Sequence, residues 1–71
     1  MDLTQVKTIA IIGLSDKSDR PSYQVAQYLI NQGYKIIPVN PNIQQVFGQK
    51  SYPNISSIPK DINIDIIDIF I

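Results

Sequence analysis

Three short apolar runs, separated by polar loops and one amphipathic stretch, set the pattern of the chain. Residues 8–12 (TIAII) form a β-branched run that ends at Gly13, and residues 35–39 (KIIPV) form a second run. The first run predicts a strand buried on both faces, as in a parallel sheet, and the second run predicts another short strand. Pro38 removes one backbone donor, which favours an edge position or the end of its strand. The third run, residues 62–71, is strongly β-prone and predicts a further strand.

The stretch between the first two runs predicts a helix over residues 21–32. Its apolar side chains recur at helical spacing and form one stripe, made by Val25, Ala26, Leu29 and Ile30. Pro21 stands in the first turn, and Asp19 precedes it as a polar cap. Gly33 follows as the expected C-cap.

The connection between the second and third runs contains turn signals. Residues 40–42 (NPN) predict a turn. Residues 43–50 predict a short irregular segment with a turn at Gly48. Asn54 is expected to cap one helical turn over residues 55–58.

The order strand, helix, strand, short helix, strand predicts an α/β fold with a Rossmann-like parallel sheet in three layers and right-handed crossovers. The last strand is the most apolar one, and such a strand needs cover on each face. We therefore expect residues 1–71 to be the N-terminal part of a single domain, truncated after the strand that ends at Ile71. The alternative that these residues form one half of a domain completed by another chain stays open as well.

Composition narrows the function classes. The chain has 71 residues, no cysteine, no histidine and a formal net charge of zero. Bulk charge therefore gives no reason to expect nucleic acid as a partner, and no apolar run reaches the ~18 residues of a membrane span. We expect a cytoplasmic protein without a metal site, and no enzyme, because the usual general bases are missing. Residues 20–60 carry no carboxylate, which fits either chance or a surface for a polyanion.

The loop over residues 13–22, after the first strand, is the candidate site. Ligands of such sheets bind beyond the carboxyl ends of the strands, and a helix N-terminus offers amide donors and a positive dipole end. The loop adds the hydroxyls of Ser15 and Ser18 and the charges of Lys17 and Arg20. These groups suit a pyrophosphate or a 3′-phosphate.

A dinucleotide is the competing ligand. The dinucleotide fingerprint requires Gly-x-Gly-x-x-Gly after the first strand and an acid near the end of the second. Only Gly13 is present, Ser15 takes the place of the second glycine, and Asn40 and Pro41 stand where the acid is expected. Both departures disfavour NAD, and an NAD(P)-binding module of an oxidoreductase stays the alternative.

Five segments carry a family resemblance, namely IAIIGLS (9–15), DRPSYQVAQYL (19–29), GYKIIPVNPN (33–42), GQKSYP (48–53) and DIIDIF (65–70). They resemble the CoA-binding protein family, small stand-alone Rossmann-like domains similar to the CoA-binding domain of the succinyl-CoA synthetase alpha subunit. The resemblance implies noncatalytic binding of coenzyme A or acyl-CoA. It implies a site made by Gly13, Leu14, Ser15, Lys17, Arg20, Pro21, Ser22, Asn40, Pro41 and Phe70. A basic residue usually follows the Asp-Ile-Phe motif, where this chain has Ile71.

Other polar and aromatic residues are interpreted structurally. We expect the tyrosines to pack at the edge of the core rather than to stack on adenine; they are Tyr23, Tyr28, Tyr34 and Tyr52. The odd spacing of Asp65 and Asp68 puts them on opposite faces of a strand, so we expect them to cap the strand or to meet neighbouring loops rather than to form a metal pair. A homo-oligomer, a complementing chain and an incomplete fragment without independent function all stay open.

Overall fold

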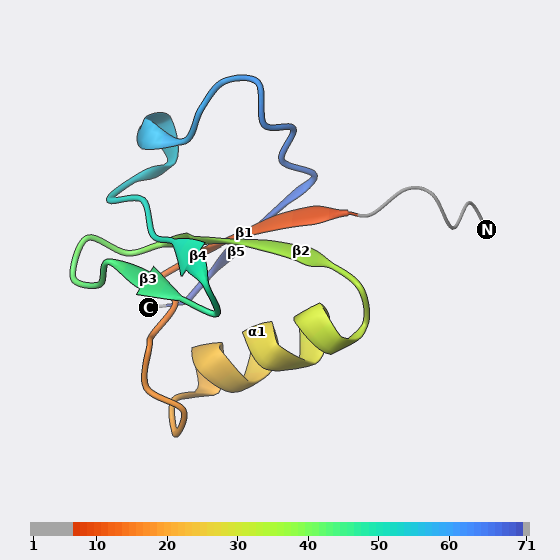
Figure 1. The fold of residues 1–71 in the computed structure, drawn as a ribbon, viewed down its shortest axis with the longest axis vertical. Coiled ribbons are helices and arrows are strands. Elements are labelled where there is room, and N and C mark those ends of the chain that lie inside the picture. The colour runs from red at the N-terminus through yellow and green to blue at the C-terminus, as the bar shows by residue number, and fades with distance from the viewer. Residues whose placement is uncertain (1–6, 71) are drawn as a thin grey trace.

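The computed structural model describes residues 7–70 (Figure 1). In chain order its elements are β1 (Thr8–Ile12), α1 (Pro21–Asn31), β2 (Lys35–Val39), β3 (Gln45–Val46), β4 (Gln49–Lys50), the 3-10 turn η1 (Ile55–Ser57) and β5 (Ile66–Ile69).

The central element is a parallel sheet with the strand order β2-β1-β5. Ile9 of β1 pairs with Ile36 on one side and with Ile66 on the other. The chain passes from β1 through α1 to β2, and β5 then joins the opposite edge of β1. The predicted α/β class with a parallel sheet is confirmed. In sheets of this kind ligands bind where the strand order reverses, and here this point lies between the carboxyl ends of β1 and β5.

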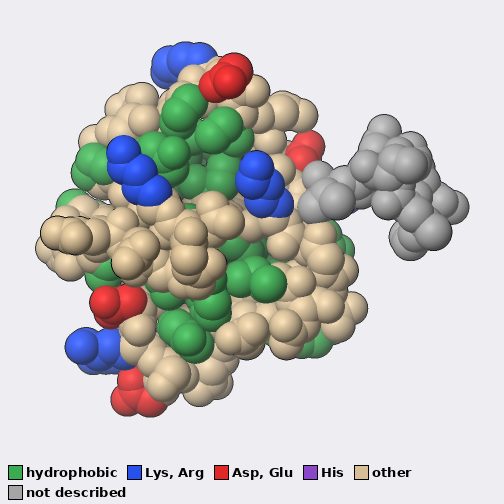
Figure 2. Space-filling model, viewed as in Figure 1, with side chains coloured by type: hydrophobic (Ala, Val, Ile, Leu, Met, Phe, Trp, Pro, Cys, Tyr) green, Lys and Arg blue, Asp and Glu red, His purple; other side chains and the backbone are tan. Residues whose placement is uncertain are grey.

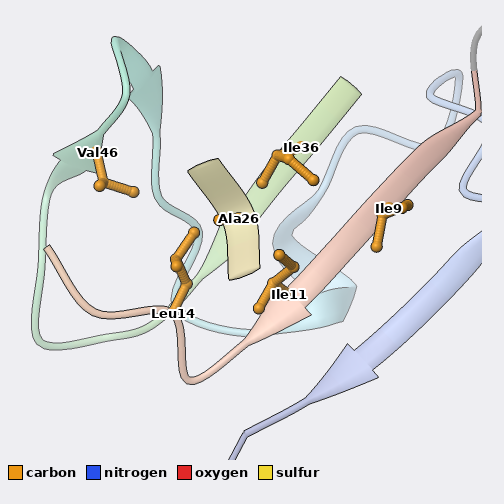
Figure 3. Close-up of a cluster of buried hydrophobic side chains, with 6 residues drawn as sticks. All are labelled: Ile9, Ile11, Leu14, Ala26, Ile36 and Val46. Carbon is orange, nitrogen blue, oxygen red and sulfur yellow. The ribbon is translucent and has the colours of Figure 1, made fainter. Parts of the chain in front are cut away.

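One face of the sheet packs against α1 and the β3–β4 hairpin. Ile9 and Ile11 of β1 and Ile36 of β2 project toward Ala26 of α1 (Figure 3). The hairpin joins this cluster because the ring of Phe47 lies 4.5 Å from that of Tyr23, centroid to centroid. Helix and hairpin thus form one apolar layer under the sheet.

The opposite face is covered by the segment that contains η1. Ala10, Ile37, Val39 and Ile58 form its buried cluster, with Ile62 and Ile64 packed against them. Figure 1 shows this segment and α1 on opposite sides of the sheet. The predicted third layer is therefore present as an irregular segment with one 3-10 turn.

The helix signals are mostly confirmed. Gly33 follows α1 with a φ of +95°, as a C-terminal glycine does. The predicted cap is wrong, because the N-cap is Arg20 and no side chain caps the helix. Asp19 lies one residue before the cap position. It belongs to a turn in which the Arg20 amide donates to the Lys17 carbonyl at 3.1 Å. The cap of η1 is confirmed, since Asn54 accepts a 2.9 Å hydrogen bond from the Ser57 amide.

The last strand is shorter than the run 62–71 predicts. Asp65 begins the pairing, because its amide donates to the Thr8 carbonyl and its carboxylate accepts from the Thr8 amide, both at 2.9 Å. Ile62 and Ile64, which precede Asp65, pack against the buried cluster on the face of the sheet opposite α1. They therefore do not extend the strand. The predicted strand cap is confirmed for Asp65, and Ile71 lies outside the described residues.

The β3–β4 hairpin was not predicted as strands. Its turn is formed by Phe47 and Gly48, with φ values of 55° and 72°. Positive φ at both central residues is typical of a tight hairpin turn. The turn predicted at Gly48 is therefore confirmed.

Three of the four tyrosines pack as expected. Tyr23 and Tyr34 pack on the helix-side cluster and Tyr52 on the other one. Tyr28 is 62% exposed on α1, so the interpretation is wrong for this residue. Within residues 7–70, no helix is both long and apolar enough to cross a membrane.

Candidate functional site

The carboxyl ends of β1, β2 and β5 are joined by backbone hydrogen bonds. The Gly13 amide donates to the carbonyl of Val39 at the end of β2, at 2.8 Å. The Phe70 amide, just after β5, donates to the Ile12 carbonyl, also at 2.8 Å. The candidate loop therefore begins at the point between β1 and β5 where the strand order reverses.

Gly13 fits this junction because it has no side chain. Its φ is +85°, a conformation that other residues rarely adopt. A Cβ at this position would overlap the carbonyl oxygen of Phe70. The glycine thus lets the loop turn against the end of β5.

The loop is organised by its own serines. The Ser15 amide donates to Ser22 Oγ at 3.0 Å, and the Lys17 amide donates to Ser15 Oγ at 3.0 Å. Ser22 is buried in the first turn of α1. The two hydroxyls fix the loop against the helix without a ligand.

The first turn of α1 presents free amide donors. Pro21 has no N–H, and Ser22 and Tyr23 find no hydrogen-bond acceptor for their amides within residues 7–70. The first turn carries no acidic residue. The positive end of the helix dipole and two amides are therefore available to an anion.

A hollow of about 280 Å³ lies at this turn. It is lined by seven of the predicted site residues: Gly13, Ser15, Lys17, Arg20, Pro21, Ser22 and Phe70. Pockets that hold a drug-sized ligand measure roughly 300–1,000 Å³. This hollow therefore suits a part of a large ligand, such as its phosphates.

The loop carries both basic and acidic side chains, and these differ in whether they line the hollow. Figure 2 shows basic and acidic side chains together over the loop that precedes α1. Lys17 and Arg20 line the hollow, whereas Asp16 and Asp19 of the same loop do not. The wall of the hollow is therefore basic although the loop as a whole is balanced.

The remaining predicted site residues lie elsewhere. The side chain of Leu14 is fully buried in the helix-side cluster, so only its backbone belongs to the loop. Asn40 and Pro41 line a second hollow of about 320 Å³, together with Ser51, Lys50 and others. The structure thus brings seven of the ten residues together, and their role as ligand contacts stays a prediction.

Asn40 connects the second hollow to the loop. Its side-chain amide donates to the Leu14 carbonyl at 2.9 Å, and its Oδ1 accepts from the Asn42 amide at 2.9 Å. The hydroxyl of Ser51, a buried residue, accepts a hydrogen bond from the backbone amide of Asn40 at 3.1 Å. It donates one to the backbone carbonyl of Asn40 at 2.9 Å. Sequence reasoning missed Ser51, because nothing in its local pattern distinguishes it from a serine in a loop.

A metal site finds no support among the described residues. Within 7–70, no group of three or more histidine, cysteine, aspartate or glutamate side chains gathers in one place. The available chemistry is therefore that of amide donors, hydroxyls and two basic side chains.

The family comparison points to a ligand for such a site. Residues 7–71 match the family model described as a CoA binding domain. The protein YneT of Bacillus subtilis is 43% identical over 68 residues, which are 96% of this chain and 49% of YneT. The ADP-forming acetate–CoA ligase II of Archaeoglobus fulgidus is 37% identical over 68 residues, 93% of this chain but 10% of the ligase.

Solved structures share the fold. A hypothetical protein from Pyrococcus horikoshii superposes with a TM-score of 0.85 at 40% identity, over 96% of this chain and 46% of its own. A conserved hypothetical protein from Pyrococcus furiosus gives a TM-score of 0.82 at 29% identity, over 92% and 54%. The chain thus spans about half the length of the small proteins that it matches.

Proposed function

Since the chain belongs to the CoA-binding domain family, we propose that the hollow at the N-terminus of α1 binds the phosphates of coenzyme A or an acyl-CoA without catalysing a reaction. One observation supports this proposal most directly. The free amide of Ser22, the N-terminal end of α1 and two basic side chains converge on one hollow at the carboxyl end of the sheet, and the free amide of Tyr23 lies in the same helical turn.

Each group has a distinct task in this proposal. The amides of Ser22 and Tyr23 donate to phosphate oxygens along the helix axis. Arg20 offers a planar fork that bridges two oxygens, and Lys17 offers a point charge from a flexible stem. Both side chains are exposed, so they adjust to the ligand. Ser15 and Ser22 hold the loop in place for this contact.

Binding without catalysis is the second part of the proposal. The chain contains no histidine and no cysteine, and all of its acids are aspartates. Among residues 7–70, no aspartate lines the hollow, and so none of them stands as a general base where the ligand would lie. We expect the thioester of acetyl-CoA to hydrolyse no faster with the protein than in buffer alone.

A dinucleotide remains the competing ligand. Ser15 stands where the fingerprint requires a glycine, and its hydroxyl occupies space beside the loop amides. No acid lies at the Asn40–Pro41 turn to hold a ribose. NAD should therefore bind more weakly than CoA.

Thermal denaturation and calorimetry with CoA and with NAD test the proposal. We expect CoA to raise the melting temperature, NAD to leave it unchanged, and the affinity for CoA to fall as salt is added, since exposed charges are screened. Arg20→Ala and Lys17→Ala should each weaken CoA binding. Lys35→Ala is the matched control, because Lys35 is also exposed but begins β2 at the other end of the sheet.

Two results would contradict the proposal. One is a stabilisation by NAD with none by CoA. The other is an Arg20→Ala variant that binds CoA as tightly as the Lys35→Ala control.

A further inference from the structure

The second hollow, beside the turn that follows β2, has a different lining from the hollow at α1. Its volume is about 320 Å³, and its wall is made by Asn40, Pro41, Ile43, Gln44, Lys50, Ser51 and Pro53. All of these side chains except Lys50 are apolar or uncharged. Ligand pockets are typically lined in this way, with a few polar or charged groups that fix the orientation of the ligand. This hollow therefore suits an organic group that carries one anionic substituent.

The two hollows are neighbours at the carboxyl end of the sheet. The Asn40 side chain, which lines the second hollow, donates to the carbonyl of Leu14 in the loop that forms the first one. The backbone adds another link, because the Gly13 amide donates to the carbonyl of Val39, the residue before Asn40. A ligand with its diphosphate at α1 therefore has the second hollow beside the next part of its structure.

The backbone next to Lys50 is fixed to the end of β2. Two residues beyond Lys50, the Tyr52 amide donates to the Pro38 carbonyl at 3.0 Å. The Tyr52 carbonyl accepts from the Asn40 amide at 2.8 Å. Lys50 is the last residue of β4, and its ammonium lies 5.4 Å from the centre of the Tyr52 ring, a cation–π distance. The fold thus holds the base of this side chain beside the turn after β2, while the side chain itself is exposed.

The charge of Lys50 stands in surroundings without acids. Residues 20–60 contain no carboxylate. In the part of the chain that the structure describes, no acidic side chain lines the second hollow. A positive charge beside an uncharged wall favours a ligand with a negative group at that point.

We propose that Lys50 binds the 3′-phosphate of CoA, so that the chain prefers CoA to dephospho-CoA. This inference rests on the proposed function, in which the hollow at α1 binds the diphosphate. In CoA, the ribose that carries the 3′-phosphate and the adenine is attached directly to that diphosphate. The adenosine then lies in the second hollow, and the ammonium turns from Tyr52 toward the 3′-phosphate. A lysine suits this contact because its point charge sits on a flexible stem.

The other basic side chains are placed differently. Lys17 and Arg20 line the hollow at α1, where the proposed function assigns them to the diphosphate. Lys60 follows η1 and lines neither hollow. Lys50 and Lys60 are both exposed, so Lys60 is the matched control for a change of charge.

A purely structural role for Lys50 predicts a different result. A lysine that only packs on Tyr52 contributes to the stability of the hairpin, and its loss affects both ligands alike. A contact with the 3′-phosphate affects CoA alone. The difference between the two affinities is therefore the quantity to measure.

Calorimetry with CoA and dephospho-CoA measures this difference, because the two ligands differ only in the 3′-phosphate. We expect the unchanged chain to bind CoA about tenfold more tightly, the value of one exposed charge-assisted hydrogen bond. Lys50→Met should lower the affinity for CoA to that for dephospho-CoA and leave the latter unchanged. Lys50→Arg, which keeps the charge, should retain the preference. Lys60→Met should bind both ligands as the unchanged chain does, and circular dichroism checks that each variant is folded.

The outcomes separate this inference from the proposed function. Arg20→Ala should weaken the binding of both ligands by the same factor, because the diphosphate is common to them. Equal affinities of the unchanged chain for the two ligands, or a preference for CoA that survives in Lys50→Met, would overturn the role of Lys50. In either case a loss of affinity in Arg20→Ala would still support the diphosphate site. The absence of binding by both ligands would overturn the inference and the proposed function together.

Discussion

The side-chain amide of Asn40 donates a 2.9 Å hydrogen bond to the backbone carbonyl of Leu14, and so joins the end of β2 to the loop that begins after β1. The two residues are 26 positions apart in the chain. Because Leu14 is fully buried while the next residues line the hollow, this bond sets where the loop leaves the core. Asn40 therefore acts on the site by positioning the loop.

Asn40→Asp tests this positioning role. The carboxylate keeps an acceptor for the Asn42 amide but cannot donate to Leu14, and it faces that carbonyl with a negative charge. We expect the free energy of unfolding to fall by about 1–3 kcal/mol, the cost of an unsatisfied partly buried group. Amide exchange at Ser15 should become faster without any ligand.

Asn42→Asp is the control for charge, because Asn42 is exposed and contributes its backbone amide to this network. Equal effects of the two changes on Ser15 exchange would show that Asn40 does not position the loop.

Gly13 and Gly33 form a second matched pair. Both have positive φ, at +85° and +95°, but a Cβ at Gly33 meets nothing within 4 Å, whereas at Gly13 it meets the Phe70 carbonyl. Gly33→Ala should cost only the backbone strain of about 1–2 kcal/mol. Gly13→Ala should cost more, about 3 kcal/mol or more, because the end of β5 must move.

Urea denaturation of both glycine variants measures the difference. If Gly13→Ala is no more destabilising than Gly33→Ala, the close approach of the loop to β5 is not present in solution.

Ser22→Ala tests the internal order of the loop. Ser22 Oγ accepts the Ser15 amide from a buried position, so its removal leaves that amide unsatisfied. We expect a loss of about 1–2 kcal/mol in stability and weaker binding of CoA. Ser18→Ala, at an exposed position of the same loop, should change stability by less than about 0.5 kcal/mol. Indistinguishable variants would exclude Ser22 as the fixing residue.

The parts of the fold that follow local rules were predictable from the sequence. The β-branched run of β1, the stripe on α1 and Gly33 at its end each carry a periodicity or a backbone requirement. The β3–β4 hairpin does not, because two-residue strands are too short to show alternation and Phe47 is an unusual residue for positive φ. The start of β5 depends on Asp65 meeting Thr8, a contact made only in the folded chain.

The same distinction holds for the candidate site. The loop after β1 could be found because a strand, a glycine and a helix start are adjacent in sequence, and six of its predicted residues line one hollow together with Phe70. The buried position of the Leu14 side chain and the hydrogen bond from Asn40 to the Leu14 carbonyl could not be predicted from the sequence. Both depend on the packing of β2 beside β1, which the sequence pattern does not resolve.

In the proposed function, phosphate oxygens of CoA meet the free amides at the first turn of α1. Amide chemical shifts recorded by NMR during a titration with CoA measure this most directly. We predict the largest shift changes at Ser22 and Tyr23, with changes at Lys17 and little at Gly33 or Lys35 at the far ends of α1 and β2. Shift changes that spare Ser22 and Tyr23 and concentrate on the hollow at Lys50 and Ser51 would show that CoA does not bind at the N-terminus of α1.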